Sequence, residues 1–249
     1  MIKNPQKKLF EKIHNQYRDH YYDIESMKYR EKFIYKYLFN NINLNQCKVA
    51  EIACGSGVNS KAMIKQFPTA TVEGFDISEL ACQDYKKFVE CNAYVKDMTK
   101  SHHWEQKYDC VMVLGGLHHC INNLNNTFRN IYSMLKPGGL LIMSEPNKQF
   151  ILQFLREIWY KRDTFFEENS EEALDHDELI RMNSEKFNLK EVKYFGGPAY
   201  FLIFNSLILR VPLRVKPLIS NLLFSFEILY NKLNYKYLSP AFISQWKKK

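Results

Sequence analysis

Several features that mark special classes of protein are missing from this 249-residue chain. Its first 22 residues carry four lysines and no apolar core, so we expect no secretory signal. The best candidate for a membrane span, residues 199–209, is broken by two polar residues and is well short of the ~18 residues that a spanning helix needs. The chain has neither an internal repeat nor a low-complexity segment. With 46% hydrophobic and 25% charged residues, it has the composition of a folded globular protein.

Cysteine is scarce, and its spacing does not suggest metal binding. The six cysteines form no C-x-x-C pair and lie in a chain far larger than a disulfide-stapled module. We therefore expect reduced thiols in a cytoplasmic protein. Cys120 follows His118 and His119, but adjacent side chains point apart, so no metal site is expected there.

Acidic residues are almost absent from the C-terminal fifth of the chain. The formal net charge is +8, and residues 195–249 hold eight basic residues against one acid, Glu227. Residues 1–194 therefore carry a net charge of only +1. The basic character belongs to one late segment and says little about the rest of the protein.

The central part of the chain alternates short apolar runs with helical patterns. A helical segment at 10–39 comes first. Seven strands are expected, at 48–54, 71–77, 93–97, 108–114, 140–145, 189–195 and 241–246. Helices are expected between the early strands, at 59–66, 78–89 and 123–135. Strand alternating with helix predicts an α/β fold with a doubly wound, mostly parallel seven-stranded sheet, whose ligands bind at the carboxyl ends of the strands.

A glycine-containing loop joins the first expected strand to the first helix. Gly55 and Gly57 let the backbone approach a ligand closely, and the helix behind them begins with unpaired N–H groups. Asp76 ends the second strand, where a carboxylate can accept hydrogen bonds from two ribose hydroxyls. Asp97 ends the third strand, where it can meet an adenine amine. These positions predict a ligand that contains a nucleoside.

Two kinds of cofactor use such a loop. A nicotinamide or flavin site needs G-x-G-x-x-G/A, but Ser60 stands at the third position. Glu51, just before the loop, would repel a pyrophosphate, whereas it suits the cationic amino acid end of S-adenosylmethionine. The charge favours the methyl donor over a dehydrogenase cofactor.

The order of these residues resembles the Rossmann-like (class I) S-adenosylmethionine-dependent methyltransferases, particularly the group that acts on small molecules. The likeness covers about residues 45–147 and extends to Tyr108-Asp109 before the fourth strand and to Leu135-Lys-Pro-Gly-Gly139 before the fifth. It implies S-adenosylmethionine as cofactor and S-adenosylhomocysteine as product. It also implies that Glu51, Gly55 and Gly57 hold the methionine part, and that Ala53 and Cys54 of the same loop bind the cofactor. By the same resemblance Asp76 and Ile77 hold the ribose, Asp97 and Met98 hold the adenine, and Leu114 and Gly115 form the wall after the fourth strand. Ala53 stands where the family often has glycine.

The N-terminal segment resembles the lid helix of such enzymes. Tyr17 and Tyr22 could shield the sulfonium, and Arg30 could pair with the carboxylate of the donor. The alternative is that these tyrosines pack the helix onto the sheet.

The residues that follow the fourth and fifth strands are candidates for catalysis. Methyl transfer to a hydroxyl needs alignment of the two substrates and removal of a proton. His119 and His118 are candidate bases, and Glu145 and Asn147 are expected to face the same pocket. The alternative is a histidine that only shapes the loop. We expect transfer to oxygen, before nitrogen or carbon, of a small, lipid-like or glycosyl metabolite; the alternative is a non-catalytic partner subunit that binds the donor.

Residues 196–239 form a long insertion before the last strand. We expect a single domain over 1–249, with a helical lid at 1–44, a cofactor-binding core at 45–195, a helical cap at 196–239, and the last strand with a basic tail at 240–249. Two apolar helical stretches of the cap flank Arg210, Arg214 and Lys216, which suits peripheral contact with an anionic membrane. The favoured alternative is a cap or homodimer contact that packs on protein. Nucleic acid is disfavoured, because aliphatic runs separate the basic residues.

Overall fold

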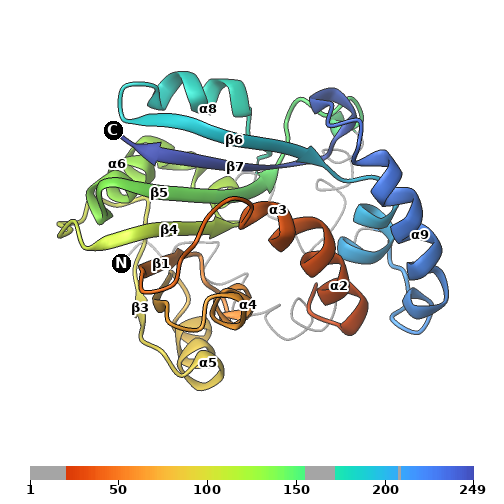
Figure 1. Cartoon of the computed structure of the whole chain (residues 1–249), viewed down its shortest axis with the longest axis horizontal. Helices are drawn as coiled ribbons and strands as arrows, with labels where there is room; N and C mark the ends of the chain where they lie inside the picture. The colour runs from red at the N-terminus through yellow and green to blue at the C-terminus, as the bar shows by residue number, and fades with distance from the viewer. Residues whose placement is uncertain (1–20, 155–171, 207–208) are drawn as a thin grey trace.

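The computed structural model describes residues 21–154, 172–206 and 209–249 (Figure 1). Its centre is one seven-stranded sheet in the order β3-β2-β1-β4-β5-β7-β6. The strands are β1 (Lys48–Ile52), β2 (Thr71–Asp76), β3 (Ala93–Val95), β4 (Tyr108–Leu114), β5 (Leu135–Pro146), β6 (Phe187–Phe195) and β7 (Ala241–Lys248). β1 to β5 pair in parallel, and β7 runs antiparallel to both β5 and β6. The predicted doubly wound, mostly parallel seven-stranded sheet is confirmed.

Several strand boundaries differ from the prediction by one to five residues, and two of these differences have a reason visible in the backbone. β1 ends at Ile52 because Ala53, with φ of 52°, turns the chain into the glycine loop. β5 begins five residues earlier than predicted, at Leu135, which pairs with Tyr108. The pairing then shifts, so that the Pro-Gly-Gly segment bulges out of the strand instead of preceding it.

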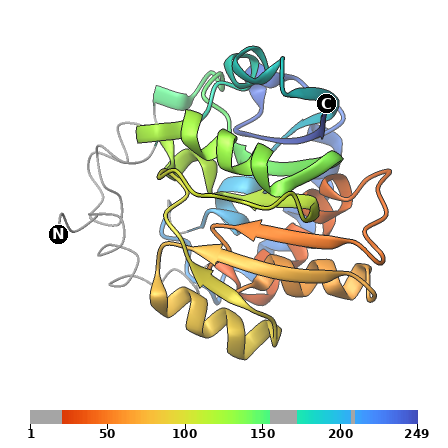
Figure 2. The same ribbon diagram turned by 90° about the vertical axis from the view of Figure 1, so that its left-hand side faces the viewer.

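Helices cover both faces of the sheet, because successive residues of a strand point to opposite sides. Val49 packs in the core with α4 (Val58–Gln66) and α5 (Glu79–Val89). Ala50 packs on the other side, with α6 (Leu124–Met134) and α8 (His176–Asn183). In both views α5 lies beside β3 at one end of the sheet, and α8 lies beside β6 at the other (Figures 1 and 2).

The helical segment predicted at 10–39 is confirmed for the part that the structure describes. It consists of α2 (Ile24–Tyr29), a π-helical stretch η1 (Arg30–Tyr35) and α3 (Lys36–Leu38). Asp23 caps it, since its carboxylate accepts the backbone N–H groups of Glu25 and Ser26. Tyr17 lies outside the described residues.

The insertion between β6 and β7 is helical, as predicted. It contains the π-helical η4 (Tyr200–Phe204), α9 (Lys216–Tyr230) and the short 3₁₀-helix η5 (Lys236–Leu238). η4 ends at Phe204, because the backbone leaves the helical conformation at Asn205. Figure 1 shows α9 at the edge of the molecule beside α2. No helix in the described part of the chain is long and apolar enough to cross a bilayer.

Candidate functional site

A cavity opens at the carboxyl ends of β1, β2, β3 and β4. Its volume is about 1090 Å³ with the open mouth included. The loops after these four strands supply most of the wall, and the remainder comes from the strand ends, the N-terminal segment, α4 and α5. The lining residues are Tyr22, Ile52, Ala53, Gly55, Ser56, Asn59, Phe75, Asp76, Ile77, Ser78, Ala81, Lys96, Asp97, Met98, Thr99, Leu114, Gly115, Gly116, His119 and Cys120.

The structure brings most of the predicted site residues to this one wall. Ten of them line it, namely Tyr22, Ala53, Gly55, Asp76, Ile77, Asp97, Met98, Leu114, Gly115 and His119. Six others do not line it, namely Arg30, Glu51, Cys54, Gly57, His118 and Glu145. Sequence reasoning missed Asn59, Lys96 and Thr99, which carried no motif of their own.

The two glycines of the loop, Gly55 and Gly57, have different structural roles. A side chain added at Gly55 would meet no atom within 4 Å, so this position is open. A Cβ at Gly57 would lie 2.2 Å from Val89 and 2.7 Å from Tyr85. Gly57 therefore allows α4 to begin against α5, and its φ of 86° is in the region that favours glycine. Ala53 shares that left-handed conformation, which is the physical reason why glycine suits its position.

The two aspartates predicted to hold a nucleoside are fixed by backbone groups. The carboxylate of Asp76 accepts the N–H groups of Gly55 and Ser78, both at 2.9 Å. Burial raises the pKa of Asp76, against the opposing effect of these hydrogen bonds. Asp97 accepts the backbone N–H of Thr99 at 3.1 Å and its hydroxyl at 2.6 Å. Both carboxylates are thus held in place at adjacent edges of the cavity.

Glu51 lies beneath the wall, not on it. Its side chain is fully buried, and its two oxygens accept hydrogen bonds from the amide of Asn59, at 3.0 Å, and from the hydroxyl of Ser60. Tyr85 donates in turn to Ser60 at 2.7 Å. Burial raises the pKa of Glu51 to about 7, while its hydrogen bonds oppose the shift. Ser60, the residue that departs from the dinucleotide pattern, is therefore needed to satisfy a buried carboxyl group.

Arg30 extends the same network toward the lid. Its guanidinium donates to the amide oxygen of Asn59 at 3.1 Å, and Tyr35 donates to the same oxygen at 2.8 Å. The guanidinium carbon lies 4.8 Å from the ring centres of both Tyr22 and Phe204. Arg30 therefore joins the lid, the insertion and the wall of the cavity.

Glu145 does not line the cavity, contrary to the prediction, and instead holds the loop that follows β4. Its buried carboxylate accepts the backbone N–H groups of Gly116 and Leu117, both at 2.9 Å, and contacts His118 Nδ1 at 2.8 Å. The rings of His118 and His119 lie 3.9 Å apart between centres. Glu145 thus orients His118, and His118 packs against the histidine that lines the cavity.

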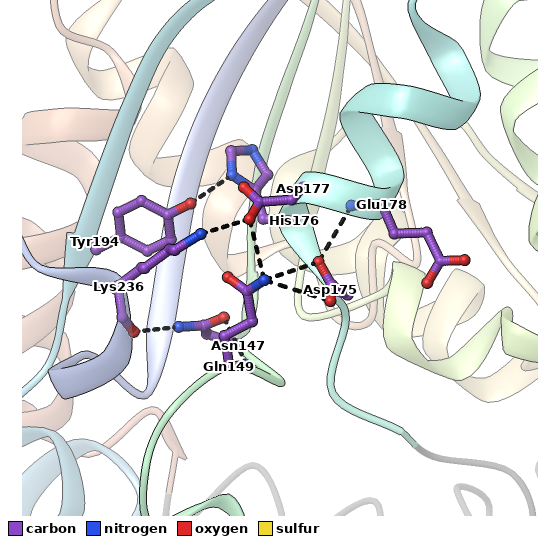
Figure 3. A network of polar contacts seen from close by, with 8 residues as sticks. All are labelled: Asn147, Gln149, Asp175, His176, Asp177, Glu178, Tyr194 and Lys236. Atoms are coloured by element: carbon purple, nitrogen blue, oxygen red, sulfur yellow. Dashed lines mark hydrogen bonds and ion pairs between the residues drawn. The ribbon is translucent and has the colours of Figure 1, made fainter.

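Asn147 does not line the cavity, contrary to the prediction. It is buried, and its amide donates to the carbonyls of Lys236 and Ser239, at 2.7 and 2.8 Å. Gln149 donates to Asp175 and to Asp177, which also pairs with Lys236 at 2.5 Å (Figure 3). We call the eight residues of Figure 3 the β5-end network. It ties the end of β5 to the start of α8 and to η5.

Comparison with known proteins identifies the domain. Residues 49–139 match the family model described as a methyltransferase domain. This chain contains a class I methyltransferase domain. The match covers the glycine loop, Asp76 and Asp97, and it ends within the bulge of β5.

The methyltransferase domain has curated relatives of low identity. Malonyl-[acyl-carrier protein] O-methyltransferase 2 of Ilyobacter polytropus is 28% identical over 145 residues, which are 57% of this chain and 54% of the relative. Ubiquinone biosynthesis O-methyltransferase of Coxiella burnetii is 28% identical over 120 residues, 46% of this chain and 50% of the relative. The chain thus spans about half the length of these relatives.

The fold itself has relatives among solved structures. A protein of Pyrococcus horikoshii aligns with a TM-score of 0.60 over 94% of this chain and 99% of its own, at 16% identity. The family implies S-adenosylmethionine as the methyl donor.

Proposed function

We propose that this protein transfers a methyl group from S-adenosylmethionine to an oxygen atom of a small or lipid-like acceptor. The observation that carries the proposal is the position of the His118–Glu145 pair beside His119, which lines the cavity. The same cavity presents the residues that suit the donor.

The residues of the cavity fit the donor. Asp76 and Asp97 present carboxylates at the ends of adjacent strands, in positions for a ribose and an adenine. The open space at Gly55 lets the donor approach the backbone closely. Asn59 lines the cavity and is oriented by Glu51 and Arg30, so it could bind the amino acid end of the donor. In this proposal Glu51 and Arg30 act through Asn59.

The donor supplies an electrophilic methyl group on a sulfonium. A lone pair of the acceptor oxygen forms the new C–O bond as the C–S bond breaks, and the bonding electrons pass to sulfur, which gives S-adenosylhomocysteine. The hydroxyl proton passes to His118, whose side chain is partly exposed and lies next to Gly115 of the cavity wall. Glu145 favours the neutral tautomer with its proton on Nδ1 and stabilises the imidazolium that forms. His119 forms the wall and holds the ring of His118 in place.

An apolar acceptor suits the aromatic side chains that the N-terminal segment, the insertion and the segment after β5 bring together. Phe204 of the insertion lies 6.0 Å from Tyr21 of the N-terminal segment, and Phe201 lies 6.0 Å from Phe150, which follows β5. Both curated relatives named above are O-methyltransferases, which supports oxygen as the acceptor atom.

The test combines donor binding with turnover. Calorimetry with S-adenosylmethionine and S-adenosylhomocysteine measures the donor site, and transfer of a radiolabelled methyl group to a panel of hydroxylated lipids, quinone precursors, polyketides and glycosides measures the reaction. Asp76→Ala should weaken donor binding by about tenfold to a hundredfold, since it removes charge-assisted hydrogen bonds. His118→Asn and Glu145→Gln should lower kcat by about a hundredfold with little change in donor affinity.

The possible results separate the competing functions. Donor binding without transfer to any acceptor in the panel or in cell extract would favour a non-catalytic partner subunit. Binding of a nicotinamide cofactor, with no binding of S-adenosylmethionine, would favour a dehydrogenase. An undiminished kcat for His118→Asn would contradict the role proposed for the histidine.

A further inference from the structure

The two faces of α9 have different environments. The inner face packs on the N-terminal helix, where Tyr29 donates to the buried carboxylate of Glu227 at 2.6 Å. Glu227 also accepts the backbone N–H groups of Gly197 and Ala199. At the start of α9, the buried Lys216 pairs with Asp23 at 2.5 Å. These contacts confirm that the insertion packs on protein, but only along one side of the helix.

The outer face of α9 is apolar and exposed. Along it, Leu218 is 82% exposed, Leu222 65%, Phe226 57%, Leu229 63% and Leu233 59%. The five residues are three or four positions apart, so those within the helix form one stripe and Leu233 continues it just beyond the end. We call them the outer stripe. A row of large apolar side chains this exposed is unusual on a protein that is surrounded by water alone.

The charges around the outer stripe have one sign. Arg210 and Arg214 precede α9, Lys232 follows it, and all three are exposed. None of the ion pairs between described residues uses them. The acid of this segment, Glu227, faces inward and is buried. The outer side of the insertion therefore presents apolar and cationic groups together.

We infer that the outer face of α9 binds an anionic membrane surface, with the helix lying in the plane of the interface and the outer stripe inserted among the lipids. Cationic groups beside an apolar helical face are the arrangement that favours anionic lipid. Tyr235 and Tyr237, which are 52% and 44% exposed, follow directly and have the amphipathic side chains that suit the headgroup level.

Charge and shape favour a membrane over a second copy of the chain as the partner of the outer face of α9. In a symmetric dimer through this face, the same patch of both subunits would meet, which would bring two sets of Arg210, Arg214 and Lys232 together. An anionic lipid surface neutralises these charges instead. The helix also lies at the edge of the molecule, where a planar surface can reach it (Figure 1).

The inference goes beyond the proposed function and does not require it. α9 packs on α2, and Tyr22, just before α2, lines the donor cavity. Membrane contact would therefore lie one helix away from the cavity, on the side of the lid.

Vesicle co-sedimentation of the full chain, without donor or acceptor, tests the inference. The vesicles contain either phosphatidylcholine alone or phosphatidylcholine with phosphatidylglycerol. Wild type should bind the anionic vesicles and much less of the neutral ones. Leu222→Ser with Phe226→Ser should lower the partition coefficient by about 30-fold or more. Arg210→Gln with Arg214→Gln should lower it by about fivefold per charge removed.

A matched control shows whether position matters. Leu80→Ser with Phe88→Ser removes two apolar side chains from α5 that are 45% and 49% exposed, and should leave vesicle binding unchanged. Circular dichroism and light scattering establish folding and oligomeric state. Absence of wild-type binding to anionic vesicles, equal binding to neutral vesicles, or full binding by the α9 variant would each overturn the inference. A wild-type dimer that the α9 variant converts to a monomer, without vesicle binding, would assign the face to self-association.

Discussion

Two buried polar networks lie near the carboxyl edge of the sheet, and they hold opposite kinds of titratable group. The first, under the glycine loop, is centred on Glu51, an acid whose pKa burial raises to about 7. The second, the β5-end network, contains His176, a base whose pKa burial lowers to about 4. In both cases the low-dielectric interior disfavours the charged form.

The networks also differ in what they adjoin. Asn59 joins the Glu51 network to the cavity, whereas the residues of the β5-end network do not line it. His176 contacts Tyr194 at 2.9 Å and Ser244 at 3.0 Å, and both belong to the sheet. Burial and hydrogen bonding alone therefore do not mark a functional residue. Contact with the cavity distinguishes the two networks.

The largest expected effect concerns the pH dependence that Glu51 imposes on stability. Its pKa is raised from 4.5, so the folded state keeps a proton that the unfolded chain releases. The free energy of unfolding should fall by about 3 kcal/mol from this group as pH rises from about 4.5 to about 7. Glu51→Gln should remove that fall. Urea denaturation of both proteins across this range measures it, and parallel curves would contradict the raised pKa.

The next effect has the opposite sign and comes from His176. Its pKa is lowered from 6.5, so the unfolded chain binds a proton that the folded state does not. The free energy of unfolding should fall by about 2 kcal/mol from this group as pH drops from 6.5 to 5. His176→Gln should lose this acid sensitivity and keep the Glu51 dependence. The same denaturation series tests it. If Glu51→Gln and His176→Gln altered the pH dependence of the free energy of unfolding in the same direction, the contrast between the two networks would be wrong.

The smallest effect separates function from stability. Asn59→Ala should weaken S-adenosylmethionine binding by about tenfold, because a hydrogen-bonding group leaves the wall of the cavity. Asn147→Ala removes the same side chain at a site away from the cavity, so it should change donor affinity less than twofold while it removes the hydrogen bonds to the carbonyls of Lys236 and Ser239. Calorimetry and thermal denaturation of both variants provide the two readouts. Equal losses of donor affinity would remove the distinction between the networks.

The sequence was a good guide to the site where local pattern and topology suffice. The carboxyl ends of neighbouring parallel strands meet at one edge, so the positions of Asp76, Asp97 and Gly115 followed from the strand pattern and the family resemblance together. The sequence was a poor guide to which side chains line the cavity and which are buried away from it. Glu51 and Asn147 stand beside the same edge, yet both are buried behind it, since the direction of a side chain at a strand end depends on the loop that follows.

The order of the elements, the mostly parallel sheet, the helical insertion and the glycine loop were determined by the sequence alone, because apolar period and turn residues act over a few positions. Tertiary structure decided that Asn59 joins Glu51 to Arg30, that Glu145 orients His118, and that one face of α9 is covered while the other is open. Tyr29 and Glu227 meet across 198 positions of the chain. Such pairs depend on how finished helices and strands pack, and no local pattern contains that information.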